Sequence, residues 1–121
     1  GVVGEGAELR VVRCRVHDCH THGVAIYGDL LGEFGGGVVD GCEIVSNGQD
    51  GVLIRGGARG DVVNNIVADN GRFGVELVDV GEGSRVLDNI VRGSGKKTPI
   101  SFGAGGGGGM APVTLSGNKL S

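Results

Sequence analysis

Residues 62–77 read VVNNIVADNGRFGVEL, and this stretch contains the pattern on which the fold of the whole chain depends. Asn65 and Asn70 are separated by short runs of aliphatic residues, and a further apolar pair, Val75 and Leu77, follows the Asn-Gly turn. Because the members of this pair are two positions apart, their side chains point to the same face of a strand. None of the apolar runs is long enough for an amphipathic helix. The stretch therefore predicts short strands joined by tight turns.

The pattern occurs in four segments and begins a fifth time before the chain ends. Its equivalent positions are Val11, Cys14, Val16, Cys19; Val39, Cys42, Ile44, Asn47; Val62, Asn65, Val67, Asn70; Val86, Asn89, Val91, Ser94; and Leu115, Asn118, Leu120. The residues at the position of Asn65 lie 28, 23, 24 and 29 positions apart, so the base period is about 23 to 24 residues. A leucine-rich repeat has a similar period but needs a leucine-dominated consensus, which this chain lacks.

Each repeat also carries a second apolar pair after its turn. These pairs are Val24 and Ile26, Val52 and Ile54, Val75 and Leu77, and Ile100 and Phe102. Three short strands in each repeat predict an all-β fold, a right-handed parallel β-helix of four to five coils. Its handedness follows from the preference of parallel crossovers. The extra residues Leu30–Gly37 and Gly103–Met110 are expected to form loops on one side of this solenoid.

The corner residues of the coils are expected to stack. Asn at these corners tolerates a left-handed backbone and can share amide hydrogen bonds with the Asn of the next coil. Cys14 and Cys42 occupy equivalent corners of neighbouring coils, within the range of a disulfide. Stacked side chains point the same way, however, so free thiols are expected.

Composition sets the class of protein and excludes two kinds of partner. The 121 residues are enough for one domain spanning 1–121, with an aliphatic core, since aromatic residues make up only 3%. A net charge of −3 argues against binding to nucleic acid. No apolar stretch is long enough to span a membrane. The chain begins without Met and without a helix to cover an open coil, so it is predicted to be a piece of a longer β-helix.

All three histidines lie in one polar cluster within residues 14–22. The cluster consists of Cys14, His17, Asp18, Cys19, His20 and His22. It could form a metal site or supply an acid–base group, but its spacing matches no zinc signature. The simpler interpretation is two buried corner thiols and exposed turn histidines, with no metal and no cofactor. His17 and His22 are kept as candidates for contact with a substrate.

Outward positions on the strand after the turn predict two columns of surface side chains. One column contains Tyr27, Arg55 and Val78, and its neighbour contains Ala25, Leu53 and Glu76. Tyr27 could stack on a sugar ring while Arg55 pairs with a carboxylate, so Tyr27, Arg55 and Glu76 are predicted to bind an acidic polysaccharide. The alternative is a solvated strand face without a ligand.

A second outward column is apolar. It contains Val12, Val63 and Leu87, with Ile66 and Ile90 beside it. Such a strip is unusual on a free surface. We expect a loop or another subunit to cover it, so self-association through this strip or through the open helix ends is a further prediction.

The segments 65–77 (NIVADNGRFGVEL) and 46–54 (SNGQDGVLI) resemble the repeats of carbohydrate-active β-helix proteins. More narrowly, they resemble the later coils of the catalytic module of mannuronan (alginate) C5-epimerases. The resemblance implies a secreted enzyme acting on a polyuronate, with catalysis that depends on a Tyr and an Asp-Pro-His segment. This chain has no Asp-Pro-His segment, and Tyr27-Gly28-Asp29 is only a faint echo of the Tyr motif. The piece is therefore expected to extend a substrate groove rather than to catalyse alone.

Two classes of function remain open at this point. The first is a part of a polysaccharide-modifying protein, a polyuronate C5-epimerase or a lyase, secreted or at the cell surface. The second is a non-catalytic β-helix module for carbohydrate binding, adhesion or self-assembly, as in tailspikes or structural repeats.

Overall fold

A computed structural model of the chain describes residues 1–28, 35–95, 99–103 and 113–121, and within these ranges it contains strands and no helix. The strands form three five-stranded sheets. Sheet A consists of β1 (Val2–Glu5), β4 (Val24–Tyr27), β7 (Val52–Arg55), β10 (Val75–Val78) and β13 (Ile100–Gly103). Sheet B consists of β2 (Glu8–Val12), β5 (Gly36–Asp40), β8 (Arg59–Val63), β11 (Arg85–Leu87) and β14 (Thr114–Ser116). Sheet C consists of β3 (Arg15–His17), β6 (Glu43–Val45), β9 (Ile66–Ala68), β12 (Ile90–Arg92) and β15 (Lys119–Leu120).

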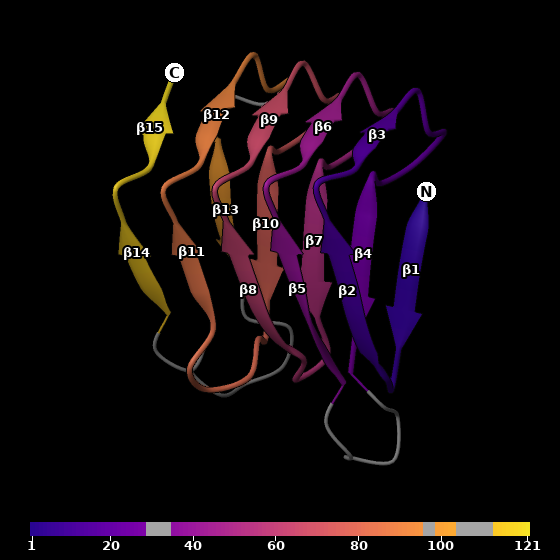
Figure 1. The fold of residues 1–121 in the computed structure, drawn as a ribbon, viewed down its shortest axis with the longest axis vertical. Coiled ribbons are helices and arrows are strands. Elements are labelled where there is room, and N and C mark those ends of the chain that lie inside the picture. The colour runs from indigo at the N-terminus through magenta and orange to yellow at the C-terminus, as the bar shows by residue number, and fades with distance from the viewer. Residues whose placement is uncertain (29–34, 96–98, 104–112) are drawn as a thin grey trace.

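Every strand pairs in parallel with the strand three places further along the chain, so successive coils lie side by side (Figure 1). The result is a parallel β-solenoid of about four turns with about 24 residues per turn. Val39 is in register with Val62, and Val62 with Val86, as the repeat requires. The predicted fold class is therefore confirmed.

The core is a narrow interior filled by columns of aliphatic side chains. Each of the three sheets contributes one or two inward columns, and their members are fully buried in the middle coils. The columns are Val11, Val39, Val62, Val86; Val16, Ile44, Val67, Val91; Val24, Val52, Val75, Ile100; and Ile26, Ile54, Leu77. Because every second strand residue points inward, each column follows directly from the sequence period.

Side-chain amides stack at two corners of the solenoid, as predicted. Asn65 donates through Nδ2 to Oδ1 of Asn89 at 2.9 Å, and Asn89 donates in the same way to Asn118 at 3.0 Å. At the other corner Asn47 donates to Asn70 at 2.9 Å. The amides of Asn47, Asn65, Asn70 and Asn89 are buried and that of Asn118 is half-buried, so the ladders satisfy backbone groups that water largely cannot reach.

The prediction that the ladder Asn residues themselves take the left-handed conformation is wrong. The left-handed residue is the one before each ladder position; the set is Arg13, Asp18, Gly41, Ser46, Asn64, Asp69, Asp88, Gly93 and Gly117. Asn64, for example, has a φ of 56°. The chain makes its corner at this exposed residue, and the next side chain is thereby directed into the interior, where its amide meets the neighbouring coil.

The two thiols at the first corners are less buried than expected. Cys14 is exposed and Cys19 half-buried, whereas Cys42 is buried. The reason is position, because Cys14 and Cys19 belong to the first coil, which has a neighbouring coil on one side only. All three cysteines are free, as predicted for Cys14 and Cys42.

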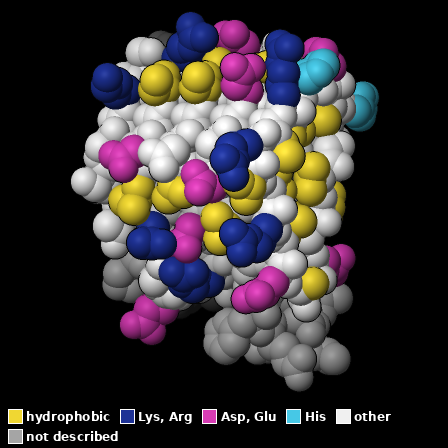
Figure 2. All heavy atoms as spheres, in the orientation of Figure 1, with side chains coloured by type: hydrophobic (Ala, Val, Ile, Leu, Met, Phe, Trp, Pro, Cys, Tyr) yellow, Lys and Arg dark blue, Asp and Glu magenta, His cyan; other side chains and the backbone are white. Residues whose placement is uncertain are grey.

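The apolar strip is shorter than its sequence spacing indicated. Asp40 lies in register between Val12 and Val63, so the column is interrupted at the second coil. The continuous part consists of Val63 and Leu87 with Ile66 and Ile90 beside them. Figure 2 shows hydrophobic side chains next to each other over β9 and β12. Ile90 is 40% exposed, so at least this part of the strip is open to solvent.

The predicted loops fall largely outside the described residues. Of the first insertion, residues 35–37 are described, and Gly36 and Gly37 belong to strand β5 rather than to a loop. At the C-terminal coil the interior is open, since Phe102, Leu115 and Leu120 are 44–50% exposed around a hollow of about 300 Å³.

Candidate functional site

The outer face of sheet A carries the predicted surface columns in the predicted register. Tyr27 pairs with Arg55 and Arg55 with Val78, while Leu53 lies between Ala25 and Glu76. Ala25 and Leu53 are buried although they point outward, Tyr27 and Glu76 are half-buried, and Arg55 is exposed. The side chains that a ligand can reach are therefore Tyr27, Arg55 and, one column across, Glu76.

The turn before each strand of sheet A adds a third column, at positions 22, 50 and 73. The backbone N–H of Asp50 points at Nδ1 of His22, 3.4 Å away, and the N–H of Phe73 donates to Oδ1 of Asp50 at 3.1 Å. These turns are tight because Gly48 and Gly71 pass directly over the previous coil. A Cβ at Gly71 would collide with the carbonyl oxygen of Gly48. The turn geometry thus holds His22 and Asp50 one coil apart.

Asp50 is the buried centre of an acid–base cluster. Its side chain is fully buried, and Oδ2 lies 3.2 Å from Nδ1 of His22. As two acceptors these atoms form no hydrogen bond, and Oδ2 is left without a partner. A buried carboxylate oxygen without a hydrogen-bond partner is costly, so this position is unusual for a residue that only stabilises the fold.

Glu76 is the carboxyl of this cluster whose pKa is shifted. A hydrogen bond to the side chain of Asp50 raises the pKa of Glu76 to about 7, and burial and the charge of Asp50 act in the same direction. Arg72, with its guanidinium 3.8 Å from the carboxylate of Glu76, and His22 oppose the shift. Two close carboxyl groups cannot both ionise cheaply, so Glu76 loses its proton only as the pH rises to about 7.

The pKa of His22 is shifted in the opposite direction, below its ordinary value. Burial lowers the pKa of His22, the charge of Glu76 opposes this, and Arg72 and Arg55 add to the lowering. The side chains of His22 and Glu76 remain 15% and 17% exposed, so both can meet a ligand, whereas Asp50 cannot. The arrangement offers a carboxyl group with a pKa of about 7 and an imidazole with a lowered pKa within one electrostatic neighbourhood, and groups of this kind can take part in proton transfer.

The structure brings together only part of the predicted set. His22, Arg55 and Glu76 lie in one electrostatic neighbourhood, and Tyr27 is in register with Arg55. His17 lies apart in sheet C, exposed and 2.7 Å from Oδ2 of Asp18. Across the part of the chain that the structure describes, no three His, Cys, Asp or Glu side chains converge as metal ligands.

Sequence reasoning missed Asp50 and Arg72. Asp50 occupies the repeat position of His22 one coil later, and comparison of the turn residues column by column would have identified it. Arg72 precedes Glu76 by four residues and belongs to the turn, where its guanidinium also lies 5.3 Å from the ring of Phe73.

Comparison with known families agrees with the fold. The family described as "Right handed beta helix region" matches residues 1–102. The chain belongs to this right-handed β-helix family. Searches of curated proteins and of solved structures returned no match. Within the described residues, no helix is long and apolar enough to cross a membrane.

The family match establishes the β-helix architecture on which the site is built, but it does not identify a specific function. The right-handed β-helix is common among carbohydrate-active enzymes and carbohydrate-binding modules. In such a solenoid each coil adds one side chain to every surface column. In this chain the members of one column differ in chemistry, as Tyr27, Arg55 and Val78 show.

Proposed function

We propose that this β-helix binds an acidic polysaccharide along the outer face of sheet A, as part of a polysaccharide-modifying protein. The observation that carries the proposal is the pair of Tyr27 and Arg55, which occupy the same surface column in adjacent coils. Arg55 is exposed and forms no ion pair with any described residue, so its guanidinium is available to a ligand. A guanidinium pairs with a carboxylate through two parallel hydrogen bonds, and a tyrosine ring offers an apolar face to a sugar.

The acid–base cluster one coil further supports a narrower proposal, that the parent protein is a polyuronate C5-epimerase or lyase. Both reactions remove the proton next to a uronate carboxylate, and a group with a pKa near the working pH transfers such a proton most efficiently. Glu76, with its pKa of about 7, has this property, and the lowered pKa of His22 favours the neutral imidazole that could accept such a proton. Because the chain lacks the Asp-Pro-His segment, we assign to this piece the binding of the polymer rather than complete catalysis.

A second candidate function is a non-catalytic module for carbohydrate binding, adhesion or self-assembly. The exposed Ile90 favours it, because uncovered apolar surface promotes association. For either function a polymer outside the cell is the partner, so we propose that the protein is secreted or lies at the cell surface.

Binding is tested by titrating the chain with polymannuronate and with the neutral polymer dextran in a calorimeter. We expect binding of polymannuronate alone, weakened about tenfold by Arg55→Gln, since a charge-assisted hydrogen bond contributes on the order of 1.5 kcal/mol or more. Arg92→Gln, which removes an exposed arginine from sheet C, is the matched control and should bind as the unaltered protein does. No binding of polymannuronate, or equal effects of the two substitutions, would overturn the assignment of this face.

Catalysis is tested separately by NMR of the polymer after incubation. New guluronate signals indicate an epimerase and unsaturated ends indicate a lyase. Binding without either signal is the result expected for this piece alone, whereas turnover by the isolated chain would contradict the role assigned to it.

A further inference from the structure

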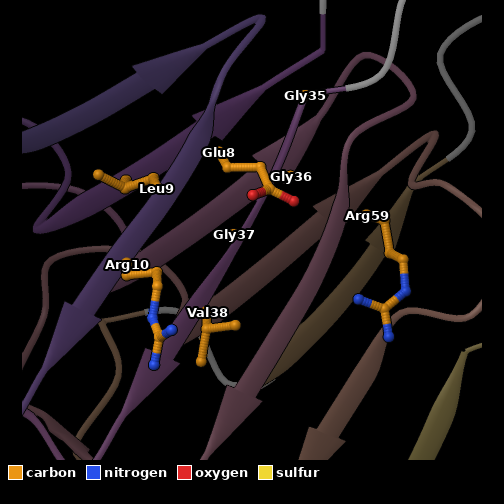
Figure 3. A pocket seen from close by; sticks show the side chains of 8 residues that line it. All are labelled: Glu8, Leu9, Arg10, Gly35, Gly36, Gly37, Val38 and Arg59. Carbon is orange, nitrogen blue, oxygen red and sulfur yellow. The ribbon is translucent and has the colours of Figure 1, made fainter.

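A hollow of about 330 Å³ lies on sheet B, which is a different side of the solenoid from the site above. It is lined by Glu8, Leu9, Arg10, Gly35, Gly36, Gly37, Val38 and Arg59 (Figure 3). The hollow exists because strand β5 has no side chain at Gly36. Gly36 is in register with Glu8 on one side and with Arg59 on the other. Two charged side chains therefore flank a gap in the strand, and Val38 of the same strand borders it.

The glycine floor is enforced by close approach of the backbone. A Cβ on Gly36 would lie 2.7 Å from the carbonyl oxygen of Arg59, and one on Gly37 would lie 2.6 Å from that of Leu9. Real Cβ atoms do not come so close, so neither position accepts another residue without a backbone shift. The tight stacking of β5 between its neighbours thus keeps the hollow open.

The charges around the hollow are unequal. Asp61 binds Arg85 at 3.0 Å and Arg59 at 3.2 Å, so one carboxylate is shared by two guanidinium groups. Burial alone would raise the pKa of Asp61, but the hydrogen bond from Arg85 and the charge of Arg59 bring it below its ordinary value. Arg10 forms no ion pair within the described part of the chain. With Glu8 as the other acid, cations exceed anions here, and Figure 2 shows the two kinds of side chain intermixed on this face.

We propose that this hollow binds one unit of a monoanionic sugar acid, with the carboxylate on Arg10 and a hydroxyl donated to Glu8. Arg10 is the carboxylate partner because Arg59 is already engaged by Asp61, and Arg59 offers its remaining N–H groups to a second hydroxyl. The volume is at the lower end of the range for small-molecule sites, which fits one sugar unit rather than several.

The carboxylate of Glu8 decides between classes of ligand. It accepts hydrogen bonds from hydroxyl groups but repels a dianion, so inorganic sulfate or a phosphate ester is disfavoured. A neutral sugar, in turn, leaves Arg10 without an anion. A ligand with one carboxylate and several hydroxyl groups satisfies both side chains. The inference is independent of polymer binding on sheet A, because the two sites share no residue.

The experiment is an NMR titration of the full chain with glucuronate, glucose and sulfate, read at the backbone amides of Gly36 and Gly37. We expect glucuronate to shift these two signals while glucose and sulfate leave them in place. Arg10→Gln should weaken the glucuronate shift about tenfold. Arg92→Gln, on sheet C, is the matched control and should leave it unchanged. Both arginines are exposed, so both variants are expected to fold, as circular dichroism will verify.

Glu8→Gln provides an independent arm. It removes the repulsive charge, so sulfate should begin to shift the amides of Gly36 and Gly37 in this variant. Three results would overturn the proposal: no response to glucuronate, an equal response to glucose, or a response that survives Arg10→Gln. Amides of sheet A, such as that of Leu53, report on polymannuronate in the same sample, so failure on one face is distinguished from failure on the other.

Discussion

Replacement of Asn65 by Ala tests whether the amide ladder or the aliphatic core determines the stability of the solenoid. The Oδ1 atom of Asn65 accepts the N–H of Cys42 at 2.8 Å, and Nδ2 donates to the carbonyl of Val39 and to Oδ1 of Asn89, both at 2.9 Å. The residue is 1% exposed, so water cannot replace these partners. Asn65→Ala thus removes three buried hydrogen bonds at once.

The loss can be estimated from these contacts. A buried hydrogen bond contributes about 1 kcal/mol net, and an N–H left without a partner costs about 1–3 kcal/mol. The N–H of Cys42 is left in this state, whereas Oδ1 of Asn89 keeps the N–H of Asn65 as a donor. We therefore expect Asn65→Ala to lower the free energy of unfolding by about 3–5 kcal/mol. That is a large part of the total stability of a small domain, about 5–15 kcal/mol.

The assay is urea denaturation followed by far-ultraviolet circular dichroism, because the chain has no Trp to report by fluorescence. Asn64→Gly is the matched control. It removes the same amide one residue earlier, where the side chain is exposed and φ is 56°, a conformation that glycine adopts freely. Its effect should stay within about 0.5 kcal/mol. A loss below about 1 kcal/mol for Asn65→Ala, or equal losses for the two variants, would refute the role given to the ladder.

Three further substitutions test other parts of the structure. Cys42→Asn should raise the free energy of unfolding by about 1 kcal/mol in the same urea assay, because it extends the amide ladder by one coil; a loss of stability would contradict this. Glu76→Gln should flatten the pH dependence of stability. The folded-state pKa of Glu76 is raised from 4.5 to about 7, so its contribution is complete below pH 4.5 and is lost as the pH rises through about 7. Thermal melts between about pH 4 and pH 8 should show a smaller pH dependence of the melting temperature for Glu76→Gln, with the exposed Glu82→Gln as control. An unchanged pH dependence for Glu76→Gln would contradict the raised pKa of Glu76. Val62→Ala should cost about 2 kcal/mol and its outward neighbour Val63→Ala less than half of that, so similar midpoints would indicate a wrong register.

The fold could be predicted from the sequence because a solenoid converts sequence period directly into position in space. Once Asn65 and Asn89 are aligned, every inward residue between them follows from the two-residue period of a strand. The exceptions arose where a residue's surroundings depend on another coil. Cys14 has the pattern of a buried corner residue but lies in the first coil, and Gly36 resembles a loop residue but completes strand β5.

The candidate site was only partly predictable for the same reason. Tyr27 and Arg55 could be placed in one column from their spacing, because both are strand residues with a fixed outward direction. Asp50 lies in a turn, and its complete burial depends on the glycines that let three coils approach closely. The displaced pKa of Glu76 then depends on Asp50, so the chemistry of the cluster could not be inferred before the turn was placed.

The mixed composition of the turn column at positions 22, 50 and 73 also has a physical reason. In a parallel solenoid equivalent positions stand about 4.8 Å apart, so a column of identical charged residues would repel along its whole length. The sequence instead alternates chemistry at this place, with His22, Asp50 and Phe73 in the turn and Glu76 on the strand beside them. An imidazole stands next to the buried carboxyl of Asp50, and the second carboxyl, Glu76, has its pKa raised to about 7, so the column avoids a run of like charges. The same arrangement leaves two titratable groups at the surface near neutral pH. If this cluster only stabilised the fold, neutral amides such as those of the two Asn ladders would do so at a lower desolvation cost than ionisable side chains.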